Sequence, residues 1–192
     1  MGARRAPHGD TALDMNLSDW LRSERALSDF VTWAEPFGQD WARAWSECPR
    51  GDWLLALAAR AGSERQELIA ASAACARLAL EVLDDDAAAP ALEGVARAEA
   101  WARGEDASTA LGAELESLLE APDPLLGAGA RAAASVLMAI EDPQSAPGAA
   151  SAAVETSMLQ AGECATMAAV SYAQRRSAEL VRAHISRAPS AR

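Results

Sequence analysis

The chain contains no lysine. All 17 of its basic residues are arginine, they stand against 28 acidic residues, and the net charge is −11. β-branched residues are also scarce, because Val, Ile and Thr together supply only 15 of the 192 residues, whereas alanine supplies about a quarter. Since β-sheets favour branched and aromatic side chains and alanine is the best helix former, a β-rich fold is excluded. The composition predicts an all-α protein.

Metal-ligating and catalytic side chains are few and scattered. Three cysteines (Cys48, Cys75 and Cys164) lie far apart without a Cys-x-x-Cys pair, and the only histidines are His8 and His184. A structural zinc site needs four closely spaced N or S ligands, and a nucleophile needs a base beside it. We therefore expect no metal, no cofactor and no enzymatic activity. The odd, dispersed cysteines favour a reducing compartment.

Long apolar runs are absent as well. No uncharged apolar stretch reaches the length of about 18 residues that a membrane-spanning helix needs. The basic start of the chain is not followed by the apolar run of a signal peptide. We expect a cytoplasmic protein without a membrane span.

Hydrophobic periodicity predicts a single domain of roughly eight or nine packed helices. Residues 1–15 are expected to form a flexible N-terminal arm, 16–187 the all-helical domain and 188–192 a C-terminal tail. Ala-rich helix pairs recur at a spacing of roughly 35–40 residues without a consensus. This spacing is compatible with HEAT-like helical pairs.

Several helix boundaries can be predicted from local chemistry. Ser63-Glu64-Arg65-Gln66 has the pattern of a capping box that starts a helix, and Asp84–Asp86 is expected to end that helix. Pro90 is expected to begin the next one, since proline is favoured in the first helical turn. Residues 148–186 keep one helical pattern, which Gly162 can bend.

Six tryptophans are unusual in a chain with one Tyr and two Phe, and four of them (Trp33, Trp41, Trp45 and Trp53) lie close together. Their helical spacing favours a core that holds short helices together. The alternative is an aromatic pocket for a small ligand, lined by Trp41, Trp45 and Trp53.

The acidic residues are unevenly distributed. Residues 1–174 carry 12 arginines against 27 acids, whereas residues 175–192 hold five arginines and one acid. An acidic body repels nucleic acid and anionic membranes and attracts basic proteins. We therefore expect neither a nucleic-acid nor a membrane partner.

Two acidic clusters are the candidate partner-binding residues: Asp84, Asp85 and Asp86, and then Glu105 and Asp106. Grouped carboxylates can steer and clamp a basic partner, and the other interpretation is solubility. Three adjacent aspartates at a helix C-terminus would repel the helix dipole, and a partner's basic side chain could recover that stability. This argument favours binding.

One stretch resembles a bacterial family. Three motifs carry the resemblance: Trp45-Ser-Glu-Cys-Pro-Arg-Gly-Asp-Trp-Leu-Leu, then Ala74-Cys-Ala-Arg-Leu-Ala-Leu, then Ala98-Glu-Ala-Trp-Ala-Arg-Gly. Together they are similar to the immunity-five-like group of immunity proteins from polymorphic-toxin loci. The resemblance covers about residues 28–105 and departs at Ala56, where the family more often has an aromatic residue.

The resemblance implies an all-α, non-enzymatic cytoplasmic protein that binds and neutralises a cognate toxin. Its motif residues have architectural roles: Asp52 would cap the helix that bears Trp53, and Arg50 would pair with an acid. The family motif identifies no toxin-binding residue.

Three functions follow as hypotheses. The first is an immunity protein that binds a cognate toxin or another basic protein through an acidic surface, as a monomer or homodimer. The second is a helical-repeat scaffold or adaptor that binds a protein or peptide in a groove. The third is a small-ligand binder that uses the tryptophan cluster.

Overall fold

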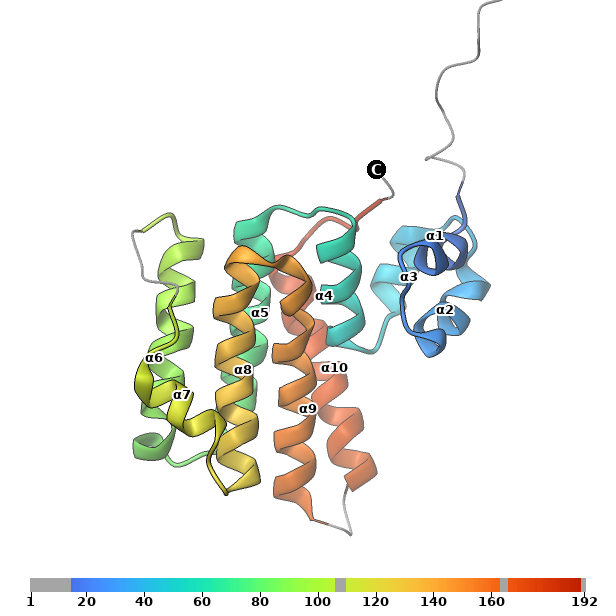
Figure 1. The fold of residues 1–192 in the computed structure, drawn as a ribbon. Helices are drawn as coiled ribbons and strands as arrows, with labels where there is room; N and C mark the ends of the chain where they lie inside the picture. Colours follow the sequence, from blue (N-terminus) through green and yellow to red (C-terminus); the bar gives the residue numbers. More distant parts are fainter. Residues whose placement is uncertain (1–14, 106–109, 163–165, 191–192) are drawn as a thin grey trace, which may run out of the picture.

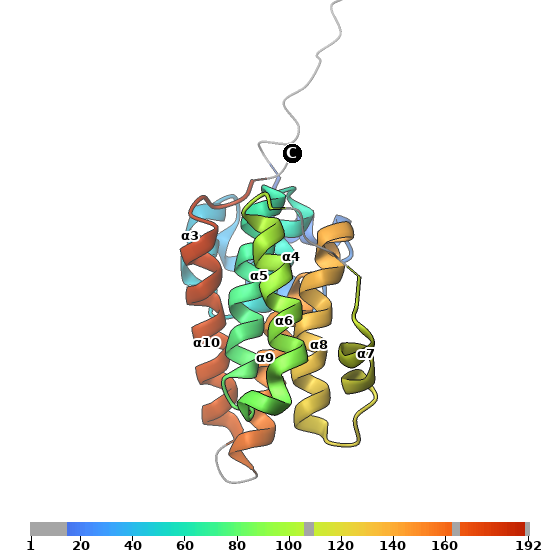
Figure 2. The same cartoon turned by 90° about the vertical axis from the view of Figure 1, so that its left-hand side faces the viewer.

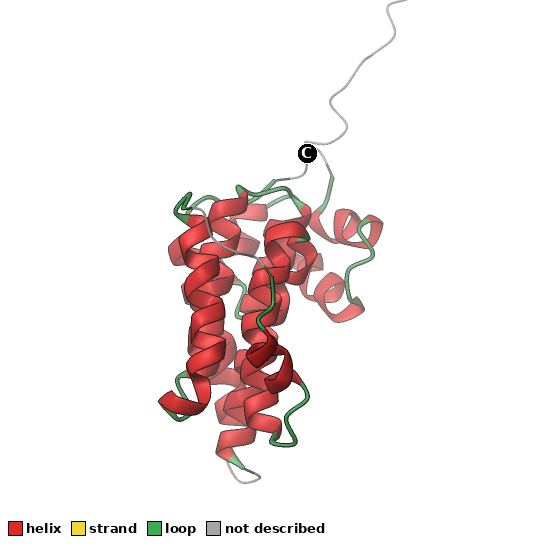
Figure 3. Ribbon diagram, turned by 60° about the vertical axis from the view of Figure 1, so that its left-hand side comes forward, coloured by secondary structure: helices red, strands yellow, loops and turns green. Residues whose placement is uncertain are grey.

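The structure is a computed structural model that describes residues 15–105, 110–162 and 166–190. These residues form ten α-helices and two short 3-10 helices, with no strand among them, as Figure 3 shows. The predicted all-α single domain is confirmed, with more helices than the predicted eight or nine. The elements are α1 (Leu17–Ser23), α2 (Ser28–Ala34), η1 (Glu35–Phe37), α3 (Trp41–Glu47), α4 (Gly51–Arg60), α5 (Arg65–Leu80), α6 (Asp85–Ala102), α7 (Ala113–Leu119), α8 (Pro124–Glu141), η2 (Pro143–Ser145), α9 (Pro147–Ala161) and α10 (Thr166–His184).

The first three helices form a small unit beside the main bundle (Figure 1). They are short because local breakers end them: Pro36 follows α2, and Gly38 has a positive φ of 53°. The Asp40 side chain then accepts from the Arg43 N–H and caps α3.

Hydrogen bonds and aromatic contacts attach this unit to the bundle. The Arg182 guanidinium on α10 donates to the Cys48 carbonyl oxygen at 2.8 Å and to the Trp45 carbonyl oxygen at 3.2 Å. Phe30 on α2 stacks on Trp53 of α4, with ring centroids 4.9 Å apart. A charged donor thus satisfies carbonyl groups at the end of α3, which has no further helical turn to accept them.

The main bundle consists of long helices that run side by side, with α5 inside it (Figures 1 and 2). Helix α5 packs against α6, α8, α9 and α10, and α9 packs against α4, α5, α8 and α10. Solenoid helices contact only their neighbours in the chain. Because α5 packs against helices that come much later in the sequence, the HEAT-like prediction is wrong.

Helix α5 begins within the predicted segment but without the predicted cap, and the predicted start of the next helix is wrong. Helix α5 has Glu64 at its N-cap position without a side-chain hydrogen bond, so the predicted capping box at residues 63–66 does not form. Helix α6 begins at Asp85, and Pro90 therefore lies inside the helix instead of starting it.

The predicted single helix over 148–186 is two helices. Helix α9 ends at Ala161, and Gly162 at its C-cap has a φ of +63°, a conformation that glycine adopts without steric strain. Helix α10 then packs back along α9 (Figure 1). The apolar pattern continues across the break because both helices bury a face in the same bundle.

Helix α8 is the one helix in the described part of the chain that is long and apolar enough to cross a membrane. It packs against α5, α6 and α9, and most of it is buried. Its position inside the bundle accounts for its composition.

The ends of the predicted domain are only partly described. The predicted arm over 1–15 lies outside the described residues except for Met15, which is exposed. In the predicted tail over 188–192, Ala188 packs on the core and Pro189 is buried, so these two residues belong to the folded domain.

Candidate protein-binding end of the bundle

The aspartate triplet starts a helix and does not end one. Helix α5 stops at Leu80, and Asp84 is the N-cap residue of α6, with its carboxylate accepting from the Asp86 backbone N–H at 3.1 Å. Asp85 and Asp86 lie in the first turn of α6. Carboxylates there complement the positive end of the helix dipole. The prediction that the triplet costs stability at a helix C-terminus is therefore wrong.

Glu105 lies beyond the opposite end of α6. The helix has 18 residues, so the two predicted clusters are separated by about 27 Å along its axis. Arg103 forms an ion pair with Glu105 at 2.6 Å, and its hydrogen bonds lower the pKa of the Glu105 carboxyl group. Asp106 lies outside the described residues. The predicted residues therefore do not form one patch.

Other acids do gather near the triplet. Helices α6 and α8 both begin at the same end of the bundle, as Figures 1 and 2 show, and Asp123 caps α8 there by accepting from the Leu125 N–H at 2.8 Å. Glu120 is exposed just after α7. None of these carboxylates has an ion-pair partner among the described residues.

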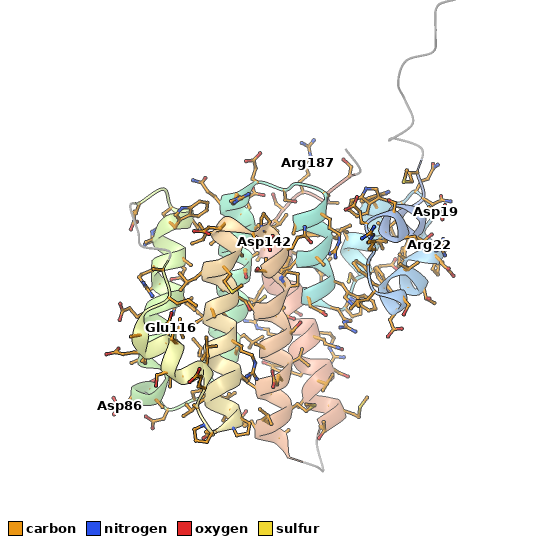
Figure 4. All side chains as sticks on the ribbon, viewed as in Figure 1. Asp19, Arg22, Asp86, Glu116, Asp142 and Arg187 are labelled. Atoms are coloured by element: carbon orange, nitrogen blue, oxygen red, sulfur yellow. The ribbon has the colours of Figure 1, made fainter. Side chains whose placement is uncertain are left out.

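The segment that carries these residues holds most of the net charge. Residues 81–123 contain twelve acids and two arginines. Figure 4 places Asp86 at the start of α6 and Glu116 on α7, while Arg187 lies at the opposite end of the molecule. The charge is thus concentrated on α6, α7 and the turn into α8.

An apolar tip lies at the same end of the bundle. Met158 and Leu159 in the last turn of α9 are each 40% exposed, and Met167 at the start of α10 is 77% exposed. Methionine is enriched at protein interfaces, where its flexible side chain adapts to a partner. We name this region the acidic end and define it by the following residues: Asp84, Asp85, Asp86, Glu120, Asp123, Met158, Leu159 and Met167.

The apolar part of the acidic end was not predicted from the sequence. Its three residues lie on either side of the α9–α10 turn, and the continuous pattern over 148–186 hides that turn. The signal that could have found it is Gly162, the only glycine in that stretch besides Gly148.

The tryptophans form two groups and no shared pocket. Trp41 meets Trp20 edge-on at 5.0 Å, whereas Trp53 lies against Phe30 and Trp33. Trp53 lines one of the four best-formed cavities among the described residues, and neither Trp41 nor Trp45 lines any of these four. Packing between helices accounts for most of the cluster, as the sequence favours.

The motif at residues 50–53 has a different arrangement from the expected one. Arg50 is the N-cap residue of α4, so Asp52 does not cap this helix. Asp52 instead accepts two hydrogen bonds from Arg50, at 3.1 Å and 2.6 Å, and the Arg50 guanidinium lies 4.2 Å from the centre of the Trp53 ring. The predicted pairing of Arg50 with an acid is confirmed.

The two cysteines that the structure describes are buried and unreactive. Burial raises the pKa of the Cys48 and Cys75 thiols to about 12, which keeps them protonated near neutral pH. Cys164 lies outside the described residues. No group of three or more His, Cys, Asp or Glu side chains in the described ranges has the arrangement of a metal site.

The fold places the chain in a broad class, the all-α single-domain bundles, with an acidic end as its candidate site. Comparison with protein-family models, curated proteins and solved structures finds no match. The resemblance to immunity proteins stays a prediction that depends on the motif residues alone.

Proposed function

We propose that the chain binds and neutralises a basic protein, as a toxin immunity protein does, through the acidic end of the bundle. The observation that carries this proposal is that carboxylates without an ion-pair partner and exposed apolar side chains lie at the same end of the fold. Neither feature alone identifies an interface, because acids also confer solubility and single exposed apolar residues are common.

The two features have separate roles in the proposed complex. Carboxylates on α6 and before α8 attract a basic surface over a distance of about one Debye length, roughly 8–10 Å at moderate salt, and speed up association. Met158, Leu159 and Met167 then lose water against the partner and slow its dissociation. Neutralisation would follow from covering a basic active-site cleft of the toxin.

The negative field also bears on which partners are excluded. A net charge of −11, ten units of it from residues 81–123, opposes contact with phosphate-rich nucleic acid and anionic lipid. We therefore propose a protein as the partner, and neither a nucleic acid nor a membrane. The adaptor hypothesis receives less support, since the helices do not stack in chain order around a continuous groove.

The test uses the product of the reading frame next to this chain's gene. Both proteins are expressed together, and growth rescue, co-purification and the Kd are measured. We expect one-to-one binding whose Kd rises at least about tenfold between low salt and about 300 mM salt, because the charges are exposed.

Two double variants separate the roles of charge and apolar contact. Asp85→Asn with Asp86→Asn keeps the Asp84 cap and should slow association about tenfold. Met158→Ser with Met167→Ser should raise the dissociation rate by roughly 30-fold if these residues form the centre of the interface.

A matched control removes two exposed charges from the opposite end of the bundle. Glu64→Gln with Glu67→Gln, at the start of α5, should leave binding unchanged. The proposal is wrong if no binding to the neighbouring product is detected, or if this control weakens binding as much as the variants of the acidic end do.

A further inference from the structure

The methionines of this protein lie on its surface and not in its core. All four that the structure describes are exposed: Met15 (37% of the residue), Met138 (54%), Met158 (40%) and Met167 (77%). The core of the described residues consists of Ala, Leu, Val, Ile, Cys, Phe and Trp instead. Since methionine is ordinarily among the residues most often buried, core packing does not account for the presence of these four side chains.

Two of the four methionines belong to the acidic end. Met158 is in the last turn of α9 and Met167 is in the first turn of α10. Met138 is in the last turn of α8, which has 18 residues and starts at the acidic end, so about 20 Å of helix separates Met138 from that end (Figure 1). Met15 precedes α1 in the small unit beside the main bundle. One pair is thus part of the proposed interface, and the other pair lies outside it.

The described cysteines do not compete with these methionines for an oxidant. Peroxides attack the thiolate form of cysteine, and burial raises the pKa of the Cys48 and Cys75 thiols to about 12, so both stay protonated and covered near neutral pH. A thioether has no proton to lose, and water reaches Met158 and Met167. Among the described sulfur atoms, those of the methionines are therefore the accessible ones.

Oxidation of a thioether adds one oxygen atom to the sulfur. The sulfur lone pair attacks one oxygen atom of hydrogen peroxide, an S–O bond forms, and the O–O bond breaks. The second oxygen atom takes the remaining proton and leaves as water, so the sulfur loses the two electrons that the peroxide gains. The product, methionine sulfoxide, is polar, and methionine sulfoxide reductases convert it back to methionine.

We propose that Met158 and Met167 form a reversible oxidation switch at the acidic end. Hydrogen peroxide converts both to sulfoxides, which releases the basic partner, and reduction restores binding. The fold tolerates the change because both side chains face water, whereas burying a sulfoxide oxygen against the partner costs free energy. This inference rests on the proposed function, since it concerns the regulation of the same surface.

The first measurement uses the full chain without a partner. The chain is treated with hydrogen peroxide, and the sulfoxide at each methionine is quantified by mass spectrometry of its peptides. We expect Met167, the most exposed, to be oxidised first, and both Met158 and Met167 to be converted while the helical circular-dichroism signal is retained. The proposal is overturned if either one stays reduced until the fold is lost.

The second measurement is the Kd for the product of the neighbouring reading frame, before and after the chain alone is treated and the peroxide is removed. The ratio of the two Kd values is compared between variants, so that an effect of a substitution on the untreated affinity cancels. The ratio should be at least about ten in the parent chain and below about two in Met158→Leu with Met167→Leu, because leucine is apolar and is not oxidised. Met15→Leu with Met138→Leu is the matched control and should give the ratio of the parent.

Two further observations keep the test decisive if the leucine variants bind poorly. In partly oxidised parent chain, the loss of binding should follow the sulfoxide content at Met158 and Met167 and not that at Met15 and Met138. Treatment with methionine sulfoxide reductases should restore the Kd. Cys164→Ser, at a position outside the described residues, should respond to peroxide as the parent does.

The outcomes separate this inference from the proposed function. If the untreated chain does not bind the neighbouring product, the proposed function is wrong and the switch is wrong with it. If the untreated chain binds, the switch alone is wrong in three cases: the oxidised chain binds equally well, the variant with leucine at 158 and 167 loses binding as the parent does, or reduction does not restore binding.

Discussion

Gly51 on α4 lies so close to Ser177 on α10 that a Cβ atom at Gly51 would be 2.5 Å from the Ser177 Oγ atom. The Ser177 backbone is equally close, with its carbonyl carbon 2.7 Å from that position. A rotation of the serine side chain therefore cannot make room. The first residue of α4 must be glycine for the two helices to approach at this distance.

Gly51→Ala should destabilise the fold by about 1–3 kcal/mol, the usual cost of overpacking a core. The same change at Gly127 in α8 is the control, because the nearest atom to its added Cβ is the flexible end of Arg131, at 3.3 Å. There the alanine should stabilise by up to about 1 kcal/mol through its higher helix propensity. Urea denaturation measures both, and equal effects at the two positions would contradict the close contact.

A second prediction concerns the start of α6. Asp84→Ala removes the cap on the Asp86 N–H and should lower the free energy of unfolding by about 1 kcal/mol. Glu93→Ala, at an exposed position farther along the same helix, should change it by less than about 0.5 kcal/mol. If Asp84→Ala stabilised the protein instead, the triplet would be unfavourable in the folded chain, and the capping role would be wrong.

The fold class was predictable because it depends on local chemistry. The alanine content predicts helices, and the described residues contain no strand. The boundaries that failed depend on tertiary structure. The helix dipole favours Asp84–Asp86 at a helix start over a helix end, but where the preceding helix stops is decided by the turn after Leu80.

The site was predictable only in part for the same reason. Asp84, Asp85 and Asp86 are exposed as expected, but their neighbours come from the turn before α8 and from the α9–α10 tip. These segments are 34 to 83 residues away along the chain. A sequence pattern shows which residues share a helix face. Which helix ends come together at one end of the bundle is decided by tertiary packing.

A third prediction concerns the attachment of the N-terminal unit. Arg182→Gln shortens the donor that reaches the Trp45 and Cys48 carbonyl groups, and it should cost about 1.5–3 kcal/mol, the usual contribution of hydrogen bonds to a charged group. Hydrogen exchange should become faster in α1 to α3 than in α5, because the change loosens this unit first.

Arg176→Gln provides the control for that experiment. Arg176 lies on the same helix, but its ion pair with Glu179 is exposed and spans only one turn. Its loss should cost less than about 0.5 kcal/mol and leave the exchange pattern unchanged. Uniformly faster exchange throughout the chain in Arg182→Gln would show that Arg182 has no specific role in attaching the unit.

The buried thiols predict how stability depends on pH. Burial raises the pKa of Cys48 and Cys75 to about 12, from an ordinary value near 9 in the unfolded chain. The unfolded chain therefore loses these protons first, so the contribution is fully present below pH 9 and disappears as the pH rises toward 12. We expect the urea midpoint to decrease as the pH is raised from about 9 to 11.

Cys75→Ala should lower the urea midpoint at pH 7, because it leaves a cavity in the core. It should also reduce the decrease of the midpoint above pH 9, since one of the two titrating groups is gone. An unchanged decline in a chain with both Cys48→Ala and Cys75→Ala would assign the alkaline loss of stability to other groups.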